Sequence, residues 1–150
     1  MAALPPPSLK GRALRLLSTR EHSRAELQAK LQNYEEEPGS LARALDELQA
    51  KGFISEQRVI ESVLHRRGAK LGAMRIRQEL QGKGLDPQAV SAALAGLKAT
   101  ELERAREVWR KKFGQPASSP QETARQMRFL STRGFASDVI RRIVAGSTDD

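Results

Sequence analysis

The sequence ELQAK at residues 26–30 returns unchanged at residues 47–51, and returns again as ELQGK at residues 79–83. The same helical segment is therefore used three times within 150 residues. Self-similarity of this kind is typical of stacked repeats, each of which packs on its neighbours. The repetition predicts an array of small units rather than one fold built around an enzyme cleft.

A second recurring pattern marks where the predicted helices end. A basic residue, a glycine and a hydrophobic residue close three apolar segments, at residues 51–53, 83–85 and 133–135. This triplet is typical of a helix C-terminus, where glycine adopts the left-handed conformation and the cation faces the negative end of the helix dipole. Units of roughly 45 residues are at the lower limit of independent stability, so neighbours must share buried surface. We therefore predict an all-α fold, an elongated tandem array of three three-helix repeats that resemble helix-turn-helix units.

The division of the chain follows from these helix ends and from its prolines. Pro5, Pro6 and Pro7 favour an extended segment, so we expect a disordered tail at residues 1–9. The repeats are predicted at residues 10–53, 54–99 and 100–146, followed by a tail at residues 147–150. No segment alternates with the period of two that a strand requires. Helix starts are predicted at Ser40, Ser55 and Asp86-Pro87, and at reciprocal capping boxes that begin with Ser23, Thr100 and Ser119.

The predicted core is aliphatic, because hydrophobic residues make up 39% of the chain and aromatic residues only 4%. Helical spacing selects the inward-facing residues. They are Ala13, Leu14, Leu17, Leu27, Leu31, Tyr34, Leu41, Ala44, Leu45 and Leu48 in the first repeat; Val59, Ile60, Val63, Leu64, Ala73, Ile76, Leu80, Val90, Leu94 and Leu97 in the second; and Leu102, Ala105, Trp109, Phe113, Ala124, Met127, Leu130, Val139, Ile140, Ile143 and Val144 in the third.

The positive charge is concentrated in the last two repeats. The formal net charge is +8, and residues 1–56 contain eight basic and eight acidic residues. Residues 57–99 contain eight basic and three acidic residues, and residues 100–150 contain ten and seven. A field of this kind suits a polyanionic partner such as DNA, RNA or an acidic protein surface.

Candidate catalytic and metal-binding groups are sparse. The chain has no cysteine, and His22 and His65 lie in different repeats without ligands at metal-binding spacing, so we interpret both as surface residues. A hydrolase or nuclease needs clustered carboxylates, whereas the acidic residues are spread over separate repeats. Gly82 and Gly84 follow a helix and lack the rest of a phosphate-loop pattern. We expect no cofactor and no metal. With no apolar segment long enough to cross a bilayer and no signal core, we expect a soluble cytoplasmic protein.

Clusters of basic residues outside the core form the candidate binding surface. They are Arg12, Arg15, Arg66, Arg67, Lys70, Arg75, Arg77, Arg110, Lys111, Lys112, Arg125, Arg128, Arg133, Arg141 and Arg142, together with Phe129. Arg125, Phe129 and Arg133 share one helical stripe away from the core, which suits stacking or partner contact. Alternatively, Phe129 packs against the neighbouring repeat and the arginines only solvate its rim.

Four segments resemble the RecX family of bacterial recombination regulators. They are ALRLLSTREHSRAELQAKL at residues 13–31, LDELQAKGFISEQRVIESVLHRR at 45–67, MRIRQELQGKGLD at 74–86 and the less diagnostic MRFLSTRGFASDVIRRIV at 127–144. The resemblance runs from about Lys10 to about Val144. It implies tandem three-helix repeats and a non-enzymatic cytoplasmic protein that regulates RecA in homologous recombination, DNA repair and the SOS response.

The resemblance also implies partners and a mode of action. Family members bind RecA and its filament on single-stranded DNA, lie in the filament groove, and inhibit ATP hydrolysis, strand exchange and coprotease activity. We expect the chain to be a monomer, to contact single-stranded DNA and, more weakly, duplex DNA, and not to associate with membranes. Not every member is so basic, so RecA contact follows more directly than DNA contact. The alternative is a free-standing basic DNA-binding module of helix-turn-helix type, which would bind naked DNA tightly with a strong salt dependence.

Overall fold

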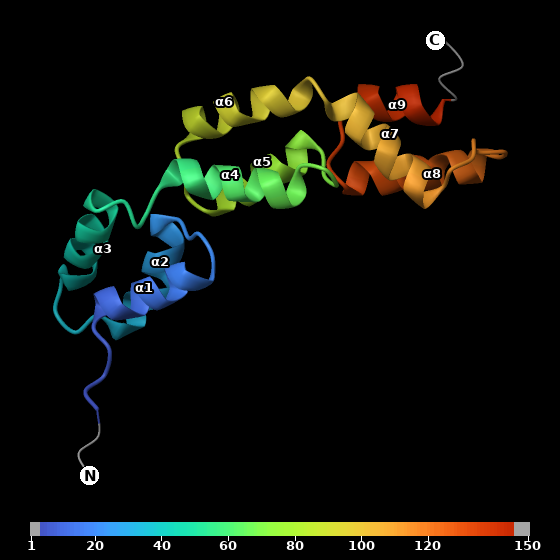
Figure 1. Ribbon diagram of the computed structural model, residues 1–150. Coiled ribbons are helices and arrows are strands. Elements are labelled where there is room, and N and C mark those ends of the chain that lie inside the picture. The colour runs from blue at the N-terminus through green and yellow to red at the C-terminus, as the bar shows by residue number, and fades with distance from the viewer. Residues whose placement is uncertain (1–3, 146–150) are drawn as a thin grey trace. The chain divides into compact units, whose positions relative to one another are not determined.

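The computed structural model describes residues 4–145, and every regular element within them is a helix (Figure 1). The elements are α1 (Leu9–Thr19), α2 (Arg24–Leu31), the short 3-10 helix η1 (Gln32–Tyr34), α3 (Ser40–Ala50), α4 (Glu56–Arg67), α5 (Ala73–Gly82), α6 (Pro87–Lys98), α7 (Glu101–Lys112), α8 (Pro120–Thr132) and α9 (Ser137–Val144). The all-α class and the three helical triplets are confirmed. Leu4 to Ser8 are exposed and lack regular structure, but Leu9, predicted as part of the tail, begins α1 and packs against the core of the first unit. The other residues of the predicted tails, 1–3 and 147–150, lie outside the described residues.

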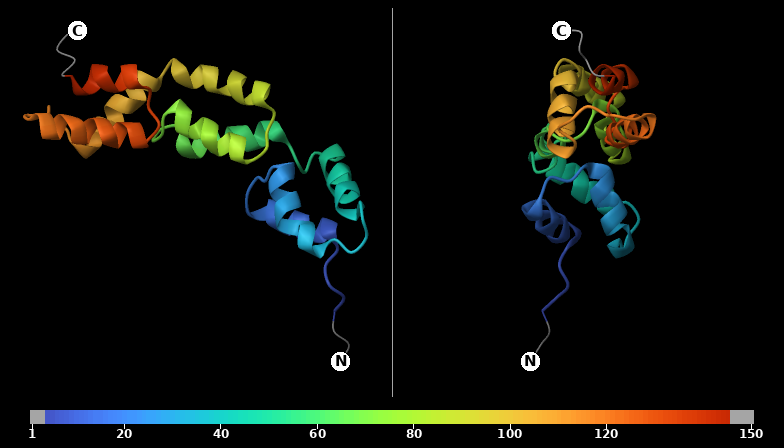
Figure 2. Two further views of the ribbon diagram at one scale, coloured as in Figure 1. Left: turned by 180° about the vertical axis from the view of Figure 1, so that it is seen from behind. Right: turned by 90° about the vertical axis from the view of Figure 1, so that its right-hand side faces the viewer.

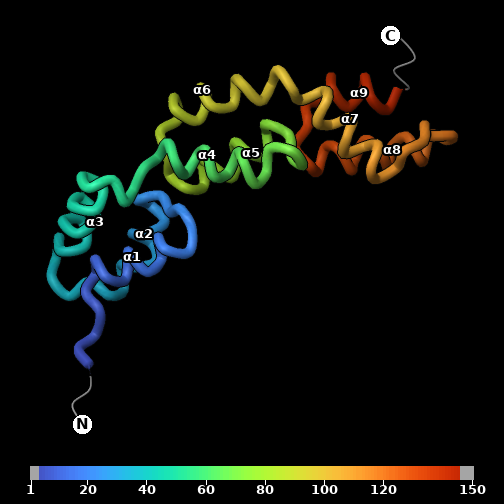
Figure 3. The backbone as a smooth tube through the Cα atoms, in the orientation of Figure 1, coloured from blue at the N-terminus to red at the C-terminus, as the bar shows by residue number. Residues whose placement is uncertain are grey.

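The contacts divide the chain into two compact units. The first unit runs to Ser62 and includes Lys83–Leu85, and the second comprises Val63–Gly82 and the chain from Asp86 onward. The backbone trace in Figure 3 follows the chain through both units. The predicted repeat boundaries, 53/54 and 99/100, fall in the connections between α3 and α4 and between α6 and α7, and they stay predictions.

In the first unit, α1, α2 and α3 pack against one another in pairs (Figures 1 and 2). Their core contains Ala13, Leu27, Leu31, Leu41, Leu45, Leu48 and Ile54. Two predicted core residues lie at the surface: Leu14 is 36% exposed and Tyr34 is 49% exposed. Leu14 lies one residue away from the buried position at Ala13. Tyr34 is turned out because α2 ends at Leu31, and the 3-10 turn that follows is wound more tightly than the α-helical spacing assumes.

In the second unit, α5 packs along α6, and α9 packs against both α7 and α8 (Figure 2). Ala73, Ile76, Val90 and Leu94 are buried on α5 and α6, as predicted. The cluster in the third triplet contains Ala105, Leu130, Phe135, Ile140, Ile143 and Val144, bordered by partly buried Leu102, Val108, Trp109, Met127, Phe129 and Val139.

Most predicted helix ends are confirmed. Ser23 and Glu26 form a reciprocal capping box, Asp86 accepts a hydrogen bond from the Ala89 amide, and Ser119 caps α8 ahead of Pro120. At the other ends, Gly52 and Gly134 have φ of 84° and 87°, and the next residue's amide donates back to the last helical turn in each case. These are glycine C-caps, as the triplets predicted.

Three capping details are wrong. Gly39 stands at the cap position of α3, and the Ser40 hydroxyl donates to the Glu37 carbonyl instead of accepting from the helix start. Thr100 makes no capping hydrogen bond, because its hydroxyl donates to the Leu97 carbonyl. At α8, Glu122 accepts from the Ser118 amide, one residue before the predicted partner.

Candidate partner-binding surface

The predicted basic residues of the third triplet differ in whether a carboxylate already neutralises them. Arg110 donates to Glu107 at 2.9 and 2.6 Å, and Lys111 lies 3.9 Å from the same carboxylate. Hydrogen bonding from Arg110 lowers the pKa of Glu107. The surface around Arg110 and Lys111 therefore carries less unpaired positive charge than the sequence suggested.

Arg128 and Arg141, by contrast, form no ion pair with a carboxylate in residues 4–145. The structure brings them from α8 and α9 to one hollow of about 280 Å³. Met127 and Ile140 supply its apolar lining, and two serine hydroxyls complete it. Arg142 is exposed on the same short helix.

Phe129 packs within its own triplet. Its ring meets that of Phe113 edge-on, with 5.4 Å between centroids, and it borders the apolar cluster. Arg133 lies 4.9 Å and Lys112 lies 5.5 Å from the ring centroid. Arg125 is exposed and lines a neighbouring hollow. The ring is thus a half-buried support for two cations, and partner contact through it stays a prediction.

The basic residues of the second triplet lie mostly in the open. Arg66, Lys70 and Arg75 are exposed, and Arg67 is 3.6 Å from Glu79 at the edge of a hollow that Arg75 also lines. Arg77 is half-buried and donates to the Ser91 hydroxyl at 3.4 Å. Met74, which precedes Arg75 on α5, is 61% exposed.

In the first unit, the predicted pair Arg12 and Arg15 lines a hollow of about 290 Å³. The Arg12 guanidinium carbon lies 3.8 Å from the centroid of the Tyr34 ring. Lys30 also lines the hollow. Sequence reasoning missed Tyr34 and Lys30 as members of this site, because helical spacing assigned the tyrosine to the core.

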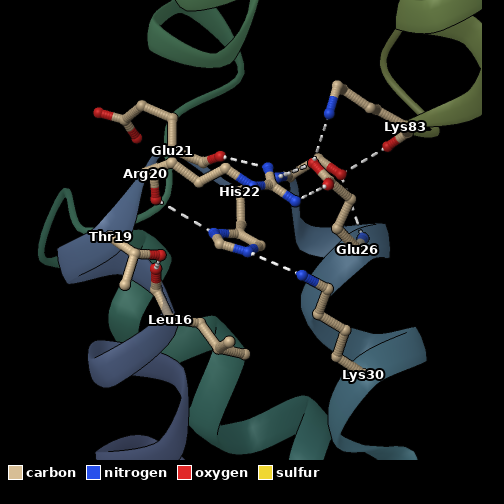
Figure 4. A network of polar contacts seen from close by, with 9 residues as sticks. Leu16, Thr19, Arg20, Glu21, His22, Glu26, Lys30 and Lys83 are labelled. Carbon is tan, nitrogen blue, oxygen red and sulfur yellow. Dashed lines mark hydrogen bonds and ion pairs between the residues drawn. The ribbon is translucent and has the colours of Figure 1, made fainter.

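A network of polar contacts in the first unit surrounds Glu26 (Figure 4). Arg20 donates to its carboxylate at 2.9 Å, the Ser23 amide donates at 3.0 Å, and the Lys83 ammonium lies at 3.3 Å. Burial alone would raise the pKa of Glu26, but these hydrogen bonds and the Lys83 charge outweigh it and lower the pKa to about 2. Glu26 is therefore a fixed negative charge.

His22 is buried beside this network, which corrects its interpretation as a surface residue. Its Nδ1 lies 3.1 Å from the Arg20 carbonyl and its Nε2 lies 3.1 Å from the Lys30 ammonium (Figure 4). A carbonyl only accepts and an ammonium only donates, so the ring is neutral with its hydrogen on Nδ1. Burial, and then the charges of Arg20 and Lys30, lower the pKa of His22 against the opposing effect of the carbonyl hydrogen bond. His65, by contrast, is exposed as predicted.

A second buried carboxylate, Glu101, joins two helix starts in the second unit. It accepts from the Ala73 amide at 2.7 Å and from the Ala136 amide at 3.3 Å. Nearby, Arg104 donates to the carbonyls of Gly68 and Leu71 at 2.6 Å each. These residues connect the second and third helical triplets. The sequence pattern assigns no role to Glu101, because the carboxylate of the predicted Thr100 capping box is that of Glu103.

Residues 4–145 contain no group of three or more His, Cys, Asp or Glu side chains arranged to hold a metal ion. Within that same range, no helix combines the length and apolarity that crossing a membrane requires.

Models of three consecutive three-helix domains match the chain, each to one of the helical triplets. The chain is thus a three-helix-repeat protein of the class found in bacterial regulatory proteins. The models describe the first, second and third three-helix domains of RecX and match residues 10–48, 55–94 and 99–144. The chain belongs to the RecX family.

Relatives of known name align with nearly the whole chain. The regulatory protein RecX of Leptothrix cholodnii is 54% identical over 140 residues, which cover 93% of this chain and 89% of the relative. That of Herminiimonas arsenicoxydans is 48% identical, with 89% of each chain covered. The crystal structure of RecX from Lactobacillus salivarius matches with a TM-score of 0.73 at 20% identity, covering 91% of this chain and 92% of that one. This last similarity concerns the fold alone.

Proposed function

We propose that this chain binds RecA and the RecA filament on single-stranded DNA, within the filament groove, and inhibits its recombinase, ATPase and coprotease activities. In this role it acts in the cytoplasm, by binding rather than by catalysis, to limit recombinational repair and the SOS response. The observation that carries the proposal is the match of all three triplets to the three RecX domains, with 54% identity to a regulatory protein RecX.

The distribution of cations supports a binding role. Arg128, Arg141 and Arg66 are exposed and form no ion pair with a described carboxylate, so their charge is available to an acidic partner. Charges at the rim of an interface mainly raise the rate of association and its salt dependence. A filament presents the same subunit surface many times, which suits a protein built of repeats.

The test is DNA-dependent ATP hydrolysis by RecA, measured with increasing amounts of the purified chain. We expect strong inhibition, and inhibition at low ratios of chain to RecA would favour capping of growing filament ends over coating. Hydrolysis unchanged at an excess of the chain over RecA would overturn the proposal. Binding to naked DNA as tight as binding to the filament would favour the free-standing DNA-binding module instead.

A charge-neutralising pair sharpens this test. Arg141→Gln removes an unpaired cation, whereas Arg110→Gln removes one that Glu107 already partly neutralises. We expect the concentration for half-inhibition to rise about fivefold or more for Arg141→Gln and less than about twofold for Arg110→Gln. Equal effects would mean that ion pairing at Glu107 does not decide which cations contact the partner.

A further inference from the structure

The hollow in the first unit has an unusual charge balance for its surroundings. Residues 1–56 carry equal numbers of basic and acidic residues, yet Arg12, Arg15 and Lys30 all line the hollow and no acidic residue does. The other cations of this unit are mostly paired, for example Arg20 with Glu26 and Arg24 with Asp46. Ion pairing elsewhere thus leaves a local positive site in a region of zero net charge.

The hollow also has the surfaces that a planar ligand needs. Tyr34 is 49% exposed, and the Arg12 guanidinium stacks on its ring at 3.8 Å. Leu16, Leu31 and Pro7 supply an apolar lining. Arginine planes and tyrosine rings are the groups on which unpaired nucleobases stack, and base stacking tolerates any sequence. An exposed aromatic ring held by a cation has no role in the core of this unit.

From this arrangement we infer that the hollow is a nucleotide-binding subsite for single-stranded nucleic acid. One base stacks against the Arg12–Tyr34 pair, and Arg15 and Lys30 hold the adjoining phosphates. Of the groups that line the hollow, only these cations and the tyrosine offer side-chain hydrogen-bond donors. The inference does not depend on the recombinase, and the subsite would operate on a naked strand.

A neighbouring acidic hollow limits the path of the strand. Tyr34 and Pro7 also line a second hollow, which contains Glu36 and Glu37. Phosphates would be repelled there, so the strand must leave the subsite on the side away from these carboxylates. Glu36→Gln combined with Glu37→Gln should therefore tighten binding about twofold to fivefold at low salt.

The test measures the binding of a fluorescent oligothymidylate of about ten nucleotides to the full chain by anisotropy, without RecA. Tyr34→Leu keeps an apolar wall but removes the ring, and we expect binding at least about fivefold weaker. With an oligonucleotide of the same length that lacks bases, Tyr34→Leu should make no difference. Arg15→Gln should weaken both strands and reduce the salt slope by about 0.7.

Arg43→Gln is the matched control, because Arg43 is an exposed cation of the same unit outside the hollow. It should change binding less than about twofold. The inference is overturned if Tyr34→Leu and Arg15→Gln bind like the parent, if Tyr34→Leu weakens both strands equally, or if an acidic leucine-containing peptide occupies the hollow more tightly than the oligonucleotide. Loss of RecA inhibition with intact oligonucleotide binding would count against the proposed function and not against the subsite.

Discussion

Glu26 in the first unit and Glu101 in the second show two ways of holding a carboxylate in the first turn of a helix. Glu26 is 15% exposed at its side chain and has charged partners, Arg20 and Lys83. Glu101 is 5% exposed and accepts from two backbone amides, those of Ala73 and Ala136. The first arrangement is an ion-pair network at the surface, whereas the second is a bridge between helix starts.

This difference in burial and partners decides how much each carboxylate contributes to the free energy of unfolding. Surface ion pairs are screened by solvent and contribute little each, whereas a buried amide that loses its acceptor costs the full desolvation of that group. We therefore expect the second unit to be the more sensitive to the loss of one side chain. Trp109, the only tryptophan of the chain, lies in this unit and reports its unfolding.

Removing the bridge should have the largest effect. Glu101→Ala leaves the amides of Ala73 and Ala136 without their acceptor and should lower the free energy of unfolding by about 4 kcal/mol. Urea unfolding followed by Trp109 fluorescence measures it. Glu103→Ala, which changes an exposed residue of the same helix, should cost less than about 0.5 kcal/mol. A loss below about 1 kcal/mol for Glu101→Ala would show that water replaces the bridge.

Filling the space beside the bridge should have the next largest effect. A Cβ at Gly72 would lie against the Gly134 carbonyl group and 2.5 Å from the Phe135 amide nitrogen, so backbone would have to move. Gly72→Ala should cost about 3 kcal/mol in the same unfolding measurement. Gly82→Ala meets nothing within 4 Å and should be neutral or stabilising. If Gly72→Ala is tolerated as well as Gly82→Ala, residue 72 does not pack closely against the backbone of residues 134 and 135.

Local signals in the sequence predicted most of the fold, and distant contacts account for the errors. The capping box at Ser23 and the glycine at residue 134 depend on neighbours within a few residues, and both predictions are confirmed. The partners of Glu101 lie 28 and 35 residues away, so periodicity and capping rules could not assign its role. The local prediction at this helix start was a capping box between Thr100 and Glu103, and it was wrong because Thr100 makes no capping hydrogen bond.

The sequence predicted which basic residues belong to the candidate surface, but it could not predict which of them lack an acidic partner. Sequence clustering found Arg110 and Arg141 equally, and only the structure distinguishes the one paired with Glu107 from the one left open. The burial of His22 was not predicted. Its partners are the Arg20 carbonyl and the Lys30 ammonium, and neither belongs to the carboxylate or metal-ligand patterns by which a functional histidine is recognised in a sequence.

The Glu26 network should contribute less than the bridge and should depend on acid. Because the pKa of Glu26 is about 2 in the folded chain and 4.5 is its ordinary value, its stabilisation is complete above pH 4.5 and is lost as the pH falls towards 2. Glu26→Gln should cost about 2 kcal/mol near neutral pH, allowing for solvent screening, with the difference shrinking in acid. Urea unfolding at each pH, followed by the fluorescence of Tyr34, the single tyrosine of the sequence, reports on this unit. A cost that is independent of pH would assign the effect to packing.

The smallest effect should come from His22, at milder pH. Its pKa is lowered from 6.5 in the folded chain, so the unfolded chain binds the proton more readily and stability falls as the pH falls below 6.5. Protonation would place a donor on Nε2 against the Lys30 ammonium. Between about pH 7.5 and pH 5.5, the parent should lose up to about 1 kcal/mol more than His22→Gln, which can bond both neighbours without titrating. His65→Gln, which changes an exposed histidine, is the matched control for the substitution. Equal slopes for the parent and His22→Gln would instead mean that Lys30 moves away and the buried ring accepts the proton at no cost.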